Sequence, residues 1–142
     1  MLDHLDFWPD VIHCNDWQTA LIPIYLKDDG VREERYRSVR TVLTIHNIEY
    51  QGRYDPYCLG DLFGLDRGWV DDGTLLLDGD LNLLKGAILT ADAVNAVSPT
   101  YAQELKNPYF AHRMEGILTQ CGYKLSGVLN GIDTVSYTHL RA

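Results

Sequence analysis

Four short apolar runs, separated by longer polar or amphipathic stretches, set the pattern of this chain. Each run has the length of a buried strand, and together they cover residues 10–14, 39–45, 93–97 and 124–129. Leucine and isoleucine recur at helical spacing between the second and third runs, which predicts a helix over residues 81–91. Mostly apolar strands that alternate with helices are typical of a parallel sheet with helices on its faces. The predicted fold class is therefore α/β.

Helix start signals follow the first and third apolar runs. Asn15 or Asp16 can cap a helix that continues through the TALIPIYLK segment, although Pro23 would kink or shorten that helix. Ser98 and Pro99 supply an N-cap and a first-turn proline for another helix. Both positions fit helices that connect successive strands of one sheet.

Two further segments carry weaker signals. Short helices are expected over residues 114–120 and near residues 59–63. The rest of residues 47–79 is rich in Gly, Asp and Tyr and has little periodicity, so a long irregular segment is predicted there. Irregular segments of that length in a compact domain are usually functional or disordered.

Polar side chains gather where each predicted strand ends. These residues are His13, Asn15 and Asp16 after the first strand, His46 and Asn47 after the second, Ser98 after the third, and Asn130 and Asp133 after the fourth. Ligands of open parallel sheets bind outside the carboxyl ends of the strands. Any one cluster could be a simple cap, but their repetition favours a shared site at this edge of the sheet.

Charge and composition narrow the class of protein. The net charge is -8, from 20 acidic and 12 basic residues without a basic block, which argues against nucleic-acid binding. No apolar run approaches the roughly 18 residues of a membrane span, and the N-terminal residues do not resemble a signal peptide. The three cysteines are far apart and are expected to be free thiols. A cytoplasmic protein without membrane or nucleic-acid partners is expected.

Several common chemistries lack their sequence signature. His13, Asp16 and His46 are metal-ligand types, but there is no HExxH and no paired Cys/His spacing, so no metal is expected. There is also no GxSxG elbow, no GxGxxG and no P-loop. What remains is a polar crevice with His, Asn, Asp and aromatic rings, which suits a carbohydrate: amides and carboxylates bind hydroxyls, and an aromatic face packs on a sugar ring.

Four ordered segments carry a family resemblance. They are PDVIHCNDWQTALIPIYL (9–26), TIHNIEYQGRY (44–54), NLLKGAILTADAVNAVSPTYAQEL (82–105) and LSGVLNGIDT (125–134). In order and spacing they resemble the bacterial glycogen synthase and plant starch synthase family. That resemblance implies a retaining glucosyltransferase that extends an α-1,4-glucan from ADP-glucose. It also implies the GT-B fold, in which two Rossmann-like domains face each other across a cleft.

The resemblance also assigns roles to individual residues. It implies that Asp16 and His46 are catalytic, with Asp16 facing the transferred glucose or the acceptor and His46 over the donor glucose. The residues implied to bind substrate are Asn47, Tyr50, Gln51, Lys85, Asn130 and Asp133. No cofactor is implied beyond the donor ADP-glucose.

The matched region is the later part of the N-terminal catalytic domain, so residues 1–134 are expected to be a partial Rossmann-like domain. The family's Lys-x-Gly-Gly-Leu donor loop would precede it and the nucleotide-binding domain would follow it, so the isolated chain is expected to be inactive. Residues 135–142 depart from the family pattern, and a non-native tail is expected there. Two alternatives stay open: a non-catalytic glucan-binding module, and a GT-B transferase that uses another nucleotide sugar such as a UDP-sugar.

Overall fold

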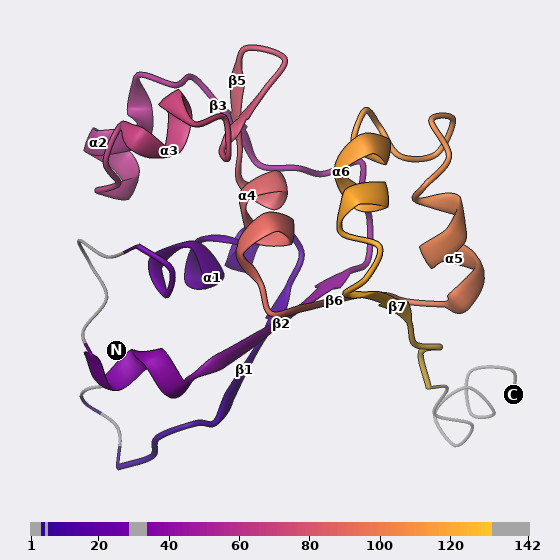
Figure 1. Cartoon of the computed structure of the whole chain (residues 1–142), viewed down its shortest axis with the longest axis horizontal. Coiled ribbons are helices and arrows are strands. Elements are labelled where there is room, and N and C mark those ends of the chain that lie inside the picture. Colours follow the sequence, from indigo (N-terminus) through magenta and orange to yellow (C-terminus); the bar gives the residue numbers. More distant parts are fainter. Residues whose placement is uncertain (1–3, 5, 29–33, 132–142) are drawn as a thin grey trace, which may run out of the picture.

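A four-stranded parallel sheet forms the base on which the helices pack, in the lower half of Figure 1. The computed structural model describes residue 4, residues 6–28 and residues 34–131, so Asp133 and the predicted tail at 135–142 lie outside the described residues. The strands are β1 (Val11–Asn15), β2 (Arg40–Ile45), β6 (Ala93–Ala96) and β7 (Leu125–Gly127), in the spatial order β1-β2-β6-β7. All three pairings are parallel. The predicted α/β class and all four predicted strands are confirmed.

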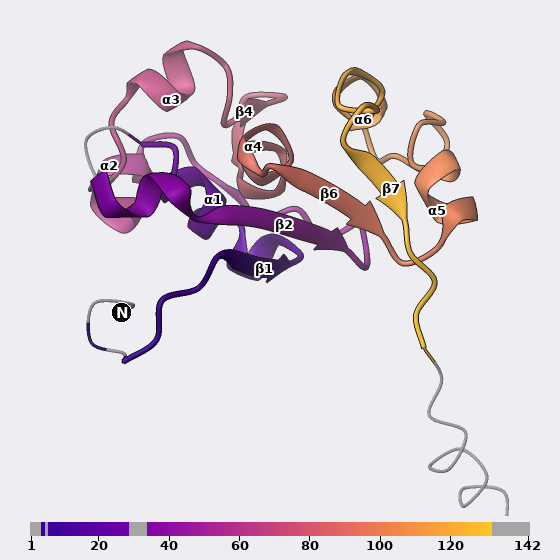
Figure 2. The same ribbon diagram turned by 60° about the horizontal axis from the view of Figure 1, so that its bottom comes forward.

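The connecting helices cover one face of this sheet. They are α1 (Leu21–Tyr25), α4 (Leu83–Thr90), α5 (Pro99–Glu104) and α6 (Glu115–Gln120), with 3₁₀ turns at Trp17–Thr19 and Glu34–Ser38. Successive parallel strands joined by right-handed crossovers in one direction bring their helices to the same side. In Figure 2, α4 and α6 lie above the strands. Buried side chains from β2, α4 and α6, such as Leu43, Ile88 and Leu118, form the core between the layers. None of the described helices is long and apolar enough to cross a membrane.

The opposite face of the sheet is more polar than predicted. β1 alternates between exposed and more buried residues instead of being uniformly apolar. On the exposed side, Nε2 of His13 lies 2.6 Å from Oγ1 of Thr44, and that hydroxyl donates to Oδ1 of Asn95 at 2.6 Å. A row of hydrogen-bonded polar side chains therefore crosses three strands on this face.

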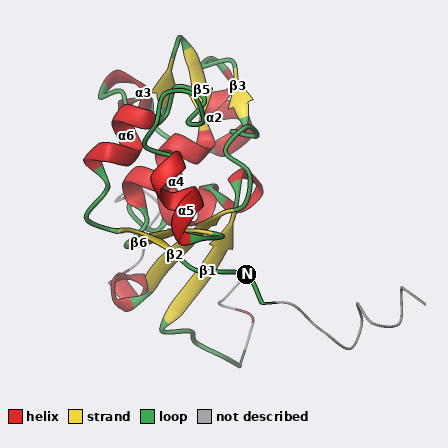
Figure 3. Ribbon diagram, turned by 90° about the vertical axis from the view of Figure 1, so that its right-hand side faces the viewer, coloured by secondary structure: helices red, strands yellow, loops and turns green. Residues whose placement is uncertain are grey.

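A smaller antiparallel sheet takes its first two strands from the segment predicted to be irregular. Its strands are β3 (Arg53–Tyr54), β4 (Leu76–Leu77) and β5 (Asp80–Asn82), in the order β3-β5-β4, with α2 (Cys58–Phe63) and α3 (Gly68–Asp71) beside them. Leu59, Leu75 and Leu81 pack with Ile24 of α1 in a second hydrophobic cluster. In Figure 3 this small lobe lies at the top and the main sheet at the bottom, with α4 between them. The short helix expected near residues 59–63 is confirmed. Much of residues 47–79 is irregular as predicted, but β3, α3 and β4 were not predicted.

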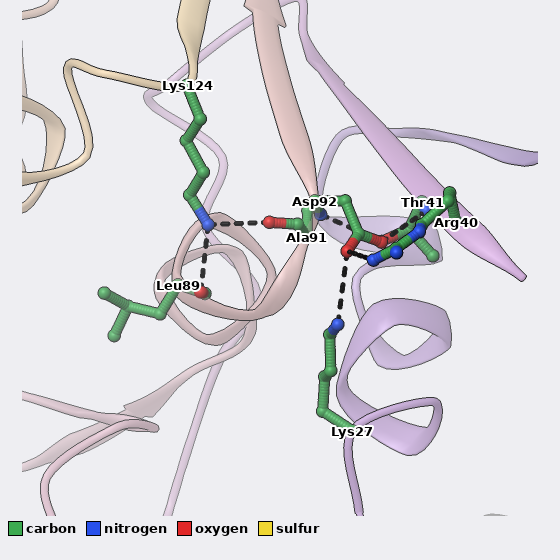
Figure 4. Close-up of polar contacts among 7 residues, drawn as sticks. All are labelled: Lys27, Arg40, Thr41, Leu89, Ala91, Asp92 and Lys124. Atoms are coloured by element: carbon green, nitrogen blue, oxygen red, sulfur yellow. Dashed lines mark hydrogen bonds and ion pairs between the residues drawn. The ribbon is translucent and has the colours of Figure 1, made fainter. Parts of the chain in front are cut away.

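Asp92 ties the amino ends of the central strands together (Figure 4). Its carboxylate accepts from the Thr41 backbone N–H at 2.8 Å, and it pairs with Nζ of Lys27 and a guanidinium nitrogen of Arg40 at 3.2 and 3.1 Å. Burial alone would raise the pKa of Asp92, but these donors outweigh burial and lower it. Beside it, Nζ of Lys124 donates to the Leu89 and Ala91 carbonyls at the end of α4. The amino-terminal edge of the sheet, opposite the predicted site, is thus stabilised by ion pairs and hydrogen bonds of charged side chains.

Candidate functional site at the carboxyl edge of the sheet

The turn that follows β2 is held by the residue that follows β1. Oδ1 of Asp16 accepts from the backbone N–H of His46 at 2.7 Å and from that of Asn47 at 3.3 Å. The first two polar clusters predicted at the strand ends are therefore brought together. Asp16 holds the N-cap position of the following 3₁₀ turn but makes no side-chain hydrogen bond to it, and Oδ1 of Asn15 is bound to His46, so the prediction that the side chain of Asn15 or Asp16 caps the helix was wrong. Its other oxygen, Oδ2, has no hydrogen-bond partner among the described residues and can accept from a ligand.

Asp16 has an unusual backbone conformation for a residue with a side chain. Its φ of 52° and ψ of -168° lie in a region that glycine adopts far more readily. Such strain persists only where the surroundings over-determine it, and it gathers at functional sites. Here the constraint comes from two sides, because the Asp16 N–H donates to the Thr44 carbonyl at 2.9 Å while its carboxylate holds the β2 turn. The strained residue is the one that joins the two strand ends.

Four consecutive backbone N–H groups in this turn are bound by side chains. After the two held by Asp16, the N–H of Ile48 donates to the hydroxyl of Tyr101 at 3.1 Å, and that of Glu49 donates to Oδ1 of Asn47 at 2.9 Å. Side chains from β1, α5 and the turn itself thus satisfy donors that a regular strand or helix would satisfy. The turn has a single well-determined conformation as a result.

The imidazole of His46 lies over the end of β1. Its Nε2 is 2.9 Å from Oδ1 of Asn15, and both residues are exposed. With Asn15 as acceptor, Nε2 carries the hydrogen and Nδ1 is free to accept. His46 therefore presents an oriented ring at the sheet edge. Its catalytic role stays a prediction.

Gln51 supports the same turn from beneath. Its Nε2 donates to the carbonyls of Ile48 and His112, both at 3.1 Å, and its Oε1 accepts from Nδ2 of Asn82 at 2.6 Å. Gln51 and Asn82 are both buried, and Asn82 also caps α4 by accepting from the Lys85 N–H. Both N–H groups of the Gln51 amide are used inside the protein. Gln51 thus shapes the turn, and direct contact with a sugar stays a prediction that its burial does not favour.

An open hollow of about 350 Å³ lies beside the turn, lined by residues 49–54 together with Trp17. Tyr50 is exposed at its rim, as an aromatic platform for a sugar ring would be. Gly52 has a φ of +65°, and a Cβ at this position would lie 2.6 Å from the Trp17 ring, so glycine is required here. A larger hollow of about 490 Å³ is lined by residues of α2, α3 and β5 and their loops. None of the strand-end residues lines it, so the candidate site is placed at the β2 turn and not in this hollow.

The third strand end is joined to this turn through α5, and the fourth lies against the third. Ser98 caps α5, as predicted, by accepting from the Tyr101 N–H at 2.9 Å. Asn130 is exposed, and its N–H donates to the Val97 carbonyl at 3.3 Å, which places it at the end of β6. Tyr101 was not predicted as a site residue. The SPTY sequence places Tyr101 in the first turn of a helix but gives no sign that its hydroxyl meets Ile48, more than 50 residues away in the chain.

The side chain of Lys85 is hydrogen-bonded to backbone carbonyls of the small lobe. Its Nζ donates to the carbonyls of Gly73 and Leu76 at 2.7 and 2.6 Å, and burial lowers the pKa of this lysine despite the nearby charge of Asp72. The ammonium ties α4 to the small lobe, and a sugar contact by Lys85 stays a prediction. Among the residues that the structure describes, no group of three or more His, Cys, Asp or Glu could hold a metal ion.

Comparison with known proteins places this geometry in a family. The family model of the starch synthase catalytic domain matches residues 1–120. The chain belongs to the starch synthase catalytic domain family. It is 44% identical to the glycogen synthase of Lactobacillus acidophilus over 96% of this chain, and 47% identical to that of Lactiplantibacillus plantarum over the same share. Each alignment covers 29% of the relative.

A solved structure shows the same relation. The catalytic domain of starch synthase IV from Arabidopsis thaliana, bound to ADP and acarbose, matches 91% of this chain with a TM-score of 0.78 and 37% identity. The match covers 27% of that chain. This member of the starch synthase family therefore spans less than a third of the length of the relatives that it matches. The predicted GT-B relationship is confirmed by this likeness.

Proposed function

We propose that the protein containing this chain is a glycosyltransferase that moves glucose from ADP-glucose to the non-reducing end of an α-1,4-glucan, with retention of configuration. The observation that carries the proposal is the turn after β2, in a chain of this family. Its His46 and Asn47 are presented at the sheet edge by the Asp16 carboxylate. The Arabidopsis starch synthase IV domain is bound to ADP and acarbose, which supports a nucleotide sugar and a glucan as the ligands here.

Glucosyl transfer needs two kinds of stabilisation. Positive charge develops on the sugar in the oxocarbenium-like transition state, and negative charge develops on the departing diphosphate. The Asp16 carboxylate and the carbonyl groups of the turn can serve the first need. The four residues that make the turn site, Asn15, Asp16, His46 and Asn47, include no lysine or arginine. We infer that the diphosphate is bound by other parts of the protein and that this chain alone is inactive. No cofactor beyond the donor, and a cytoplasmic location, are part of the proposal.

The test uses a chimera in which residues 1–134 replace the matching segment of the Lactobacillus acidophilus glycogen synthase. Labelled glucose from ADP-glucose is expected to enter glycogen. A folded, soluble chimera without incorporation would refute the proposal.

A further inference from the structure

Tyr101 lies beside the candidate site, in a position fixed by contacts of α5. It lies in the first turn of α5, where its N–H donates to the Ser98 cap at 2.9 Å. The start of α5 lies so close to β7 that a Cβ at Gly127 would overlap the backbone of Ser98 and Pro99. Helix cap and strand contact together fix where the Tyr101 ring points. The ring is half-buried and its hydroxyl meets the β2 turn.

The contact that Tyr101 makes is with backbone, at the centre of the turn. Its hydroxyl accepts from the Ile48 N–H at 3.1 Å, next to the two N–H groups held by Asp16. Asp16 follows β1, and Tyr101 lies in α5, the helix after β6. Hydrogen bonds to these two residues therefore hold the turn from two different elements. Removing the bonds on either side would leave the turn less firmly held.

The Tyr101 phenol stays protonated while it holds this position. Burial raises its pKa most, the Ile48 N–H lowers it, and the charges of Asp16 and Glu104 raise it again. A neutral phenol oxygen accepts the N–H bond well and brings no competing charge beside the Asp16 carboxylate. The phenol therefore keeps its proton, and its bond from the Ile48 N–H, across the neutral pH range.

We infer that Tyr101 is a positioning residue for the transfer reaction, which acts through the Ile48 N–H to hold His46 and Asn47 in their productive orientation. The inference rests on the proposed function for its catalytic consequence. It does not make Tyr101 a ligand contact. A displacement of catalytic groups by about 1 Å can lower the reaction rate by two orders of magnitude. Loss of a single hydrogen bond at the centre of the turn can therefore lower kcat.

Tyr101→Phe in the chimera tests this inference, because it removes the hydroxyl and keeps the ring. Tyr123→Phe is the matched control, since Tyr123 is 85% exposed and makes no side-chain hydrogen bond within the described part of the chain. Three quantities are measured for each: kcat and KM, the amide hydrogen-exchange rate of the peptide that covers residues 46–52, and Tm. For Tyr101→Phe, kcat is expected to fall about five- to tenfold, the loss of one hydrogen bond. KM for ADP-glucose should stay within about twofold, and exchange in the peptide should become faster.

Two results would overturn the inference. One is a Tyr101→Phe chimera with the exchange rate and kcat of the Tyr123→Phe control. The other is a fall in kcat that accompanies a large loss of Tm and disappears when the assay is run well below both transitions. If the unsubstituted chimera itself lacks activity, the proposed function fails, and the exchange rate of residues 46–52 still decides whether Tyr101 holds the turn.

Discussion

Replacing Asp16 by alanine removes the acceptor of two backbone N–H groups at the start of the candidate site. The bond from His46 is short, at 2.7 Å, and the bond from Asn47 is longer, at 3.3 Å. Hydrogen bonds to a charged group contribute about 1.5–3 kcal/mol each, and the longer bond to a half-exposed carboxylate counts for less. A combined loss of about 2–3 kcal/mol corresponds to a fall of about 30- to 150-fold in kcat, if the turn must be in place in the transition state.

The asparagine and glycine variants separate the possible causes. Asp16→Asn keeps an oxygen that can accept both N–H groups without charge, so a fall of only about five- to tenfold is expected. Asp16→Gly loses the bonds but relieves the backbone strain at φ 52°, so its Tm should exceed that of Asp16→Ala while its kcat stays equally low.

The assay is steady-state glucose incorporation by the chimera, with Tm measured for every variant. An Asp16→Ala chimera with a kcat within twofold of the parent would refute the reasoning. An Asp16→Asn chimera as impaired as Asp16→Ala, with Tm unchanged, would show that the charge itself acts on the ligand and that holding the turn is secondary.

Two further predictions concern the frame around the site. The lowered pKa of Asp92 means that its stabilisation is fully present above the ordinary aspartate pKa of about 3.9 and is lost as the pH falls through the lower folded value. Asp92→Asn should therefore reduce Tm of the chimera at pH 7. The difference in Tm between pH 7 and pH 3 should be smaller for this variant than for the parent chimera. An equal difference for the two proteins would contradict this account of Asp92. Gly52→Ala should reduce Tm by several degrees more than Gly64→Ala, since both have positive φ but only Gly52 faces the Trp17 ring. Equal effects of the two alanines in thermal unfolding would contradict the role given to the Trp17 contact.

The main sheet could be predicted because its signals are local. Each strand is an apolar run, and the Ser98 cap with Pro99 marks a helix start from side-chain chemistry alone. The rule that ligands bind at the carboxyl ends of parallel strands then placed Asp16 and His46 at one edge, and the structure brings them together.

The small lobe could not be predicted from periodicity. Its strands are two or three residues long and therefore show no alternation. The turn between β4 and β5 uses positive φ at Asp78 as well as at Gly79, and Asp78 is paired with Arg113 from a distant loop at 2.9 Å. Structure of this kind depends on tertiary contacts, which a single sequence does not display.

The roles of individual site residues were partly misjudged for the same reason. Asp16 has the residue type and position of a helix cap, but the neighbouring strand end offers its carboxylate two N–H groups that the helix does not. Gln51 was expected to contact substrate; its burial against Asn82 and His112 could not be predicted, and the contact with substrate stays a prediction. Tyr101 lies more than 50 residues from Ile48 in the chain, and only the fold joins them.

Glucose incorporation by the chimera and by its His46→Ala form tests the central claim most directly. The parent chimera is expected to transfer glucose from ADP-glucose to glycogen. The His46→Ala chimera should have the same Tm and a kcat lower by about 100-fold or more, because His46 is exposed and contributes little to packing. A folded His46→Ala chimera with the turnover of its parent would contradict the assignment of the β2 turn as the site of transfer.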